Sequence, residues 1–261
     1  MNNDIKNFSM DFFSLKGKVA IITGGNSGLG QGFALALAKA GADIFAVSIA
    51  DDHDVTKHLI EAENVKYHLM LADITKDDVC KEVIEECIRI YGKIDILMNN
   101  AGMCINEPDV TKFTRVQWDK MISLNLTACF ELSHEAAKYM IPQNSGKIIN
   151  TCSMFSYLGG QWSPAYAASK HGLAGFTKAY CDELAQFNIQ VNGIAPGYFA
   201  TELTTATRAD QAANQRILDH IPANRWGNVS DLMGAVVFLA SDASNYINGT
   251  LINVDGGYLV R

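Results

Sequence analysis

Short apolar segments alternate with longer amphipathic segments along almost the whole chain. The short segments are rich in β-branched and aliphatic side chains, which is typical of strands buried on both faces. They span residues 19–23, 43–49, 65–71, 94–98, 147–152, 189–194 and 251–254. Such alternation predicts βαβ units with right-handed crossovers, and therefore a parallel sheet.

The longer segments carry their apolar residues at helical spacing. After the third expected strand, one stripe holds Val79, Val83, Ile84, Cys87 and Ile88, and the opposite face is charged. Glycine and proline mark turns, and no linker divides the chain. We therefore expect one α/β domain over residues 1–261, a doubly wound parallel sheet of about seven strands of the Rossmann type. Residues 198–222 lack a clear period and are expected to form a loop-rich, lid-like insertion.

The overall composition excludes several classes of protein. Lys and Arg number 21 and Asp and Glu 28, a net charge of −7 that disfavours nucleic-acid binding. No apolar run approaches the ~18 residues of a membrane helix, and Asp4, Lys6 and Asp11 argue against a signal peptide. Because the six cysteines form no Cys-x-x-Cys pair and the six histidines show no ligand spacing, we expect free buried thiols, no metal and a cytoplasmic protein.

Ligands of an open parallel sheet bind beyond the carboxyl ends of its strands, so the residues that follow each strand are the first candidates. The first strand is followed by Thr23-Gly24-Gly25-Asn26-Ser27-Gly28-Leu29-Gly30 and the fourth by Asn99-Asn100-Ala101-Gly102. Ser153 follows the fifth strand, and Pro196-Gly197 the sixth. Each cluster alone is explained as a turn. Together they converge on one crevice, where glycines let backbone N–H groups reach a pyrophosphate.

Tyr166 and Lys170 are spaced for proton transfer. They lie four residues apart in a helix expected to begin near Pro164, so their side chains share one face. A neighbouring ammonium lowers the pKa of a tyrosine from its usual ~10, which makes the phenol a proton donor and acceptor. An ordinary amphipathic helix with a half-buried Tyr and an exposed Lys is the alternative.

Two further polar residues fit this chemistry. Ser153 stands thirteen residues before Tyr166, and its hydroxyl could hold a carbonyl oxygen by a hydrogen bond while the phenol delivers a proton. Asn125 lies within an apolar helical stretch, where a buried amide needs partners. A hydrogen-bonded core residue is the alternative for Asn125.

Jointly these motifs resemble those of the short-chain dehydrogenases/reductases with a single domain. The resemblance extends from Gly17-Lys18-Val19 to Asp255-Gly256-Gly257, almost the whole chain. It implies that Tyr166 is the general acid/base and that Lys170 lowers its pKa and binds the nicotinamide ribose. It also implies that Ser153 holds the substrate oxygen and that Asn125 holds a water in a proton relay.

The resemblance implies a dinucleotide cofactor as well. The glycine turn would hold its pyrophosphate, Asp73 and Ile74 would border its adenine, and residues 100–102 its adenosine ribose. The implied cofactor-binding residues are Gly24, Asn26, Ser27, Gly28, Leu29, Gly30, Ser48, Asp73, Ile74, Asn100, Ala101, Gly102, Tyr166, Lys170, Pro196, Gly197, Phe199 and Thr201.

The end of the second strand bears on the choice of coenzyme. Ser48 occupies the place where an acidic residue binds a free ribose 2′-hydroxyl, and Ile49 the place where NADP-dependent relatives often carry Arg. No Lys or Arg occurs between Ser48 and Lys57, whereas the turn contains Asp51, Asp52 and Asp54. A 2′-phosphate would meet carboxylates without a local cation, so we expect NAD in preference to NADP.

A narrower resemblance concerns the substrate. Residues 221–227 and 255–259 are similar to those of 2-dehydro-3-deoxy-D-gluconate 5-dehydrogenases and gluconate 5-dehydrogenases, which interconvert an alcohol and a ketone on a sugar acid. Those enzymes carry arginines where this chain has Ile105-Asn106 and Gln161-Trp162-Ser163. Because a carboxylate favours an Arg fork, the grip would have to come from Arg208, Arg216 or Arg225.

Three other functions stay open at this point. A neutral polyol or keto-sugar would need no cation. A 3-oxoacyl-carrier-protein reductase would need a basic docking surface, which this acidic chain does not suggest. A cofactor-binding regulator would have no need for Tyr166.

The family resemblance also implies a homotetramer. The helix after Tyr166 carries apolar side chains beyond its catalytic face, namely Leu173, Phe176, Tyr180 and Leu184.

Overall fold

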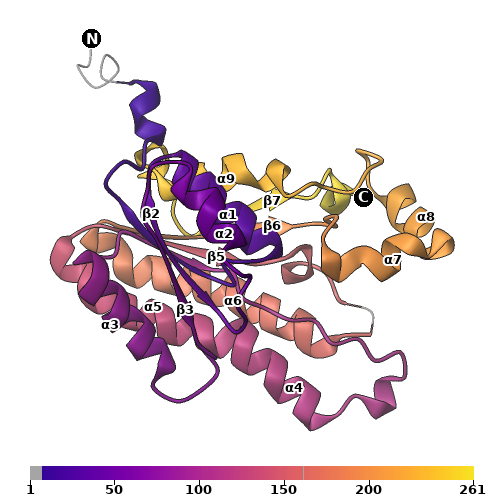
Figure 1. Cartoon of the computed structure of the whole chain (residues 1–261). Helices are drawn as coiled ribbons and strands as arrows, with labels where there is room; N and C mark the ends of the chain where they lie inside the picture. The colour runs from indigo at the N-terminus through magenta and orange to yellow at the C-terminus, as the bar shows by residue number, and fades with distance from the viewer. Residues whose placement is uncertain (1–7, 161) are drawn as a thin grey trace.

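The computed structural model describes residues 8–160 and 162–261, and it is built on one sheet of seven parallel strands (Figure 1). The strand order is β3-β2-β1-β4-β5-β6-β7, which is the predicted doubly wound arrangement. All seven predicted strands are confirmed, with ends that differ by at most two residues. Their bounds are β1 Val19–Thr23, β2 Asp43–Ser48, β3 Tyr67–Leu71, β4 Ile96–Asn99, β5 Gly146–Thr151, β6 Ile189–Pro196 and β7 Leu251–Val254.

Helices cover both faces of the sheet. In Figure 1, α1, α2 and α9 lie on one side, and α3, α4, α5 and α6 lie on the other. Because successive side chains of a strand point to opposite faces, Ala20 and Ile22 of β1 enter one core and Val19 and Ile21 the other. The helices are α1 Gly28–Lys39, α2 Val55–Glu61, α3 Val79–Tyr91, α4 Arg115–Ile122, α5 Ala128–Gln143, α6 Pro164–Leu184, α7 Thr205–Ala209, α8 Gln211–His220 and α9 Ser230–Ala240.

Two predicted helix features are confirmed. Val83, Ile84 and Cys87 of the predicted stripe in α3 are buried, Val79 and Ile88 are partly buried against the same core, and Cys80 is buried in addition. Helix α6 begins at Pro164, because a proline in the first turn lacks only an N–H that would have no intrahelical acceptor. No helix in the described part of the chain is long and apolar enough to cross a bilayer.

The stretch from residue 198 to 222 is largely helical, so the prediction of a loop-rich insertion was wrong. It contains α7 and α8, and the Asp210 side chain caps α8 by accepting hydrogen bonds from the N–H groups of Ala212 and Ala213, each at 3.0 Å. The role of this stretch as a lid stays a prediction.

The outer face of α6 is less apolar than predicted. Leu173 and Leu184 are 0% and 6% exposed because they pack into the cores below the helix. Only Phe176 and Tyr180 remain partly exposed among the four side chains expected there. The cysteines are all free thiols, as predicted, and four of the six are buried.

Candidate active site

The turn after β1 accepts only glycine at two places. Gly24 has a φ of +65°, which a side chain disfavours. A Cβ on Gly30 would lie 2.0 Å from the carbonyl oxygen of Gly24 and 2.5 Å from Nδ2 of Asn100. The start of α1 therefore approaches the turn closely. The first N–H groups of α1, which have no intrahelical acceptor, form a site for an anion.

Thr23 fastens this turn to the one after β4. Its hydroxyl oxygen accepts hydrogen bonds from the backbone N–H groups of Asn100 and Ala101, each at 2.9 Å. The side chain of Asn100 donates back to the Thr23 carbonyl at 2.9 Å. The sequence analysis included Thr23 in the glycine motif but gave it no role, although a hydroxyl that directly precedes the glycines was an available signal. These bonds hold two of the predicted cofactor-binding turns side by side.

The aspartates that follow β2 already form hydrogen bonds or ion pairs with neighbouring residues of the chain. The Asp52 carboxylate accepts hydrogen bonds from the N–H, at 2.8 Å, and the hydroxyl of Thr56. Lys57 forms an ion pair with Asp54 at 3.8 Å. Ser48 is 8% exposed, and its hydroxyl has no partner among the described residues. The glycine cradle, the open N-terminus of α1 and this unpartnered hydroxyl fit a dinucleotide.

Lys170 is buried beneath the crevice, with only 4% of its surface exposed. Its ammonium donates a hydrogen bond of 2.6 Å to the carbonyl of Thr151, the last residue of β5. The same nitrogen lies 5.6 Å from the centroid of the Tyr166 ring. A Cβ on Gly102 would lie 3.8 Å from that nitrogen and 3.2 Å from Oδ1 of Asn125. The residues that follow β4, the end of β5 and helix α6 therefore lie close together around the Lys170 ammonium.

Asn125 is fully buried in η4 (Ser123–Thr127), a π-helical turn between α4 and α5. Its Oδ1 accepts the N–H of Met103 at 2.9 Å, and its Nδ2 donates to the Met103 carbonyl at 2.9 Å and to Ser169 Oγ at 3.2 Å. The side chain therefore braces the loop after β4. The water relay that the resemblance implies for Asn125 stays a prediction.

Ser153 follows β5 and is 6% exposed. Its hydroxyl oxygen accepts the N–H of Phe155 at 3.2 Å, which leaves the hydroxyl proton free to donate elsewhere. The Tyr166 ring lies edge-on against Phe155, with 6.0 Å between the ring centroids. The backbone N–H of Ser153 donates to Ser156 Oγ at 3.3 Å. Sequence reasoning missed Ser156, and its three-residue spacing from Ser153 was the only signal.

The other predicted cofactor residues differ in exposure and in their hydrogen-bond partners. Asp73 is exposed and Ile74 buried directly after β3, and Thr75 holds the pKa of the Asp73 carboxyl below its usual range by hydrogen bonds. The N–H of Gly197 donates to the Val254 carbonyl at 3.0 Å. The ring of Phe199 belongs to the core under α1 and α9, so only its backbone can face a nicotinamide. The Thr201 carbonyl accepts a hydrogen bond from Arg208 at 3.0 Å.

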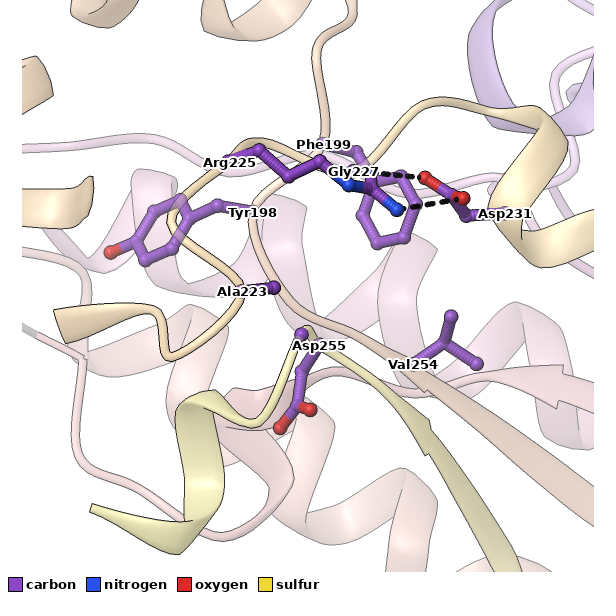
Figure 2. Close-up of a pocket in the computed structure, with 9 residues that line it drawn as sticks. Tyr198, Phe199, Ala223, Arg225, Gly227, Asp231, Val254 and Asp255 are labelled. Atoms are coloured by element: carbon purple, nitrogen blue, oxygen red, sulfur yellow. Dashed lines mark hydrogen bonds and ion pairs between the residues drawn. The ribbon is translucent and has the colours of Figure 1, made fainter.

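A cavity of about 270 Å³ lies beyond the ends of β6 and β7. Its wall includes Arg225, which forms two hydrogen bonds of 2.7 and 3.1 Å with the Asp231 carboxylate. Figure 2 shows the Tyr198 hydroxyl pointing away from this pair. Ser153, Tyr166 and Lys170 do not line the cavity, so it is separate from the proposed catalytic residues.

Aromatic side chains hold α8 against the end of the chain. Tyr198 contacts Trp226 and Tyr258 with ring centroids 5.5 and 5.4 Å apart, and His220 contacts Tyr258 at 4.3 Å. Burial, chiefly, raises the pKa of Tyr198 to about 12, and the positive charge of Arg216 opposes this rise. Arg216 lies one turn before His220, and its guanidinium forms no ion pair or hydrogen bond with a residue in the described ranges. It is the unengaged arginine of the predicted three.

The two loops that carry arginines in the resembled enzymes are bonded to each other in this chain. The N–H of Glu107 donates to the Trp162 carbonyl at 2.8 Å, and the Ser163 hydroxyl donates to the Ile105 carbonyl at 2.9 Å. Gln161, the first residue of the predicted departure, lies outside the described residues.

A model of the short chain dehydrogenase family matches residues 18–212. The chain belongs to this family. It is accordingly an NAD(P)-dependent oxidoreductase, and the predicted family and fold are confirmed.

Individual relatives span nearly the whole chain. An uncharacterized oxidoreductase of Escherichia coli K12, YgcW, is 66% identical, with 97% of each chain covered. The 2-dehydro-3-deoxy-D-gluconate 5-dehydrogenase of the same strain is 47% identical over 95% of this chain and 98% of its own. A gluconate 5-dehydrogenase from Burkholderia cenocepacia J2315, solved with NADP and tartrate, is 37% identical with a TM-score of 0.91, covering 96% of this chain and 98% of that one. The predicted similarity to 2-dehydro-3-deoxy-D-gluconate 5-dehydrogenases and gluconate 5-dehydrogenases is therefore confirmed.

Proposed function

We propose that this short-chain dehydrogenase interconverts a secondary alcohol and a ketone on a sugar acid, with NAD as coenzyme. The observation that carries the proposal is the buried Lys170, which bonds to Thr151 at the end of β5, two residues before Ser153, and lies 5.6 Å from the centroid of the Tyr166 ring. The similarity to a 2-dehydro-3-deoxy-D-gluconate 5-dehydrogenase supports the substrate class.

Each side chain has a defined task in this mechanism. Ser153 donates its free hydroxyl proton in a hydrogen bond to the substrate oxygen. In the reductive direction Tyr166 gives its proton to that oxygen, and in the oxidative direction it takes the proton back. The Lys170 ammonium, 5.6 Å from the ring, stabilises the negative charge that then develops on the phenol. A nicotinamide bound in the crevice supplies or accepts the hydride.

The carboxylate of the substrate is assigned to Arg216. Arg225 is paired with Asp231, and Arg208 is bonded to the Thr201 carbonyl. Arg216 carries its charge on α8 near Tyr198. A guanidinium that retains all its donors can receive a carboxylate through two parallel hydrogen bonds.

The experiment that tests this function is a nicotinamide absorbance assay on matched substrates. A six-carbon 5-keto sugar acid should be reduced with a kcat/KM at least about tenfold above that of the neutral ketose of the same length, since a charge-assisted bond contributes roughly 1.5–3 kcal/mol. A preference for neutral polyols or ketoses over every sugar acid contradicts the substrate class. Reduction of 3-oxoacyl substrates alone supports the carrier-protein alternative.

The proposed preference for NAD is supported at the end of β2. Its nearest lysine, Lys57, is paired with Asp54, and the Asp52 carboxylate stands in the same turn. A 2′-phosphate there meets like charge, which costs on the order of 1 kcal/mol, or about tenfold in affinity. The Burkholderia gluconate 5-dehydrogenase was solved with NADP, as were other similar proteins, so the preference for NAD is argued from the residues of this turn alone. A higher kcat/KM with NADPH than with NADH contradicts this preference.

A homotetramer is proposed on the basis of an aromatic surface on α5 and α6. Phe130 is 44% exposed, and its ring lies 6.1 Å from that of Phe176 and 6.4 Å from that of Tyr180. The edge strand β7 adds a second unpaired surface. Apolar rings and a free sheet edge favour contact with further copies of the chain.

The proposed compartment is the cytoplasm. Six free thiols, of which Cys104 and Cys181 are partly exposed, suit a reducing environment.

A further inference from the structure

The hydroxyl of Ser156 joins two parts of the candidate active site. Its oxygen accepts the backbone N–H of Ser153 at 3.3 Å, and its O–H donates to the backbone carbonyl of Lys170 at 2.8 Å. The side chain is only 7% exposed, so water does not replace either bond easily. One hydroxyl therefore connects the turn after β5 to the helix that carries Tyr166 and Lys170.

We propose that Ser156 is a positioning residue for the dehydrogenase reaction, which it serves by fixing Ser153 relative to α6. This inference rests on the proposed function, in which Ser153 holds the substrate oxygen and Tyr166 exchanges its proton. Both groups must reach one oxygen atom at the same time. A displacement of about 1 Å at either group can cost on the order of a hundredfold in rate.

The local bonding makes Ser153 dependent on this link. Ser153 leads a short 3-10 turn, Met154–Ser156, in which the N–H of Phe155 bonds to the Ser153 hydroxyl and Ser156 closes the turn by bonding to the Ser153 backbone. Without the Ser156 hydroxyl, the buried N–H of Ser153 has no partner among the described residues. The turn would then settle against α6 without a bond that defines its distance from the helix.

Thr177 offers a matched control on the same helix. It lies seven residues after Lys170 and is 0% exposed. Its hydroxyl accepts Nδ2 of Asn150 at 2.9 Å and donates to the Leu173 carbonyl at 2.8 Å. Thr177 thus bonds α6 to β5 as Ser156 bonds α6 to the following turn, but it touches neither Ser153 nor Tyr166.

The test is a double-mutant cycle with steady-state kinetics and coenzyme binding by fluorescence. Ser156→Ala should lower kcat about tenfold or more in the otherwise native chain, with the Kd for NADH changed less than about twofold. In a Ser153→Ala background the same substitution should lower kcat less than about twofold, because the group that it positions is gone. Ser156→Thr, which keeps the hydroxyl, should restore most of kcat.

Thr177→Val should lower the thermal midpoint while kcat changes less than about twofold. The proposal is overturned if Ser156→Ala costs no more in kcat than Thr177→Val, or if it costs the same factor with and without Ser153. Should Ser156→Ala not fold, Ser156→Cys keeps a weak donor and must give an intermediate kcat. Turnover of neutral ketones alone contradicts the proposed substrate but leaves the cycle intact. An inactive native chain overturns both proposals.

Discussion

The ammonium of Lys170 and the carbonyl of Thr151 are joined by a hydrogen bond of 2.6 Å between α6 and the end of β5. A lysine with 4% exposure and this partner is not the exposed lysine of an ordinary amphipathic helix. The bond holds the ammonium at the end of β5, close to Gly102 in the loop after β4. The alternative explanation of the Tyr-x-x-x-Lys spacing is therefore wrong for Lys170.

Replacement of Lys170 by Ala should reduce both turnover and coenzyme affinity, because the proposed mechanism uses one ammonium for both. We expect kcat to fall at least about a hundredfold and the Kd for NADH to rise several-fold. Lys178→Ala, on an exposed position of the same helix, serves as the control and should change neither. If the Lys170→Ala variant binds NADH with the native Kd, Lys170 does not bind the nicotinamide ribose.

Replacement of Arg216 by Ala should raise KM for sugar acids about tenfold or more and leave turnover of neutral polyols unchanged. The Arg225→Ala control breaks the ion pair with Asp231 and should affect stability without a selective effect on acids. The measurement is the ratio of kcat/KM for an acid and a neutral substrate of equal length. If Arg225→Ala alone lowers that ratio, the carboxylate binds at Arg225 instead.

A charge placed in the aromatic surface of α5 and α6 should dissociate the proposed tetramer. Phe130→Asp puts a carboxylate among the rings of Phe176 and Tyr180, where burial in an interface is costly. Light scattering at micromolar concentration should give a smaller species than the native chain. Leu59→Asp, on the exposed side of α2, is the control and should leave the mass unchanged. A native chain that is already monomeric contradicts the proposal.

Buried thiols should make the protein sensitive to alkaline pH. Burial raises the thiol pKa from 9.0 to about 12 in Cys80, Cys87 and Cys129 and to about 11 in Cys152. In the unfolded chain these thiols lose their protons near pH 9, whereas the folded chain keeps them. Their contribution to stability is therefore complete below about pH 9 and is lost as the pH rises toward 11–12.

Lys147 acts in the opposite direction, since burial lowers its pKa from 10.5 to about 8. Between pH 8 and 10.5 this lysine is protonated in the unfolded chain and neutral in the folded chain. Its contribution to the free energy of unfolding therefore rises with pH over this range. Each group changes the free energy of unfolding by about 1.4 kcal/mol per pH unit, and four thiols outweigh one lysine. Urea unfolding in reductant should show a net loss above about pH 9, with a smaller slope in Cys87→Ala. A free energy of unfolding that stays constant up to pH 10.5 contradicts this prediction.

Local pattern was sufficient for the sheet and for the turns at its strand ends, whereas the roles of the site residues were implied by the family resemblance and stay predictions. Strands such as 19–23 are buried on both faces, so nearly all their residues are apolar and the strands can be recognised in the sequence. The turns are then the residues that directly follow each strand. Helix α8 was missed because its sequence is mostly polar and none of its residues is buried. It is held by Trp226, whose Nε1 donates to Asn214 at 2.7 Å, and by Tyr258, contacts made by residues distant in the sequence. Ser156 was missed because serine in a turn has many ordinary explanations.

The most direct test of the mechanism is Tyr166→Phe, measured as turnover on the best substrate together with the Kd for NADH. The phenylalanine ring still packs edge-on against Phe155, so folding and coenzyme binding should be retained. Only the exchangeable proton is removed, and kcat should fall at least about a thousandfold, as expected when a general acid is lost. Turnover within about tenfold of the native rate in a chain that binds NADH normally would contradict the account.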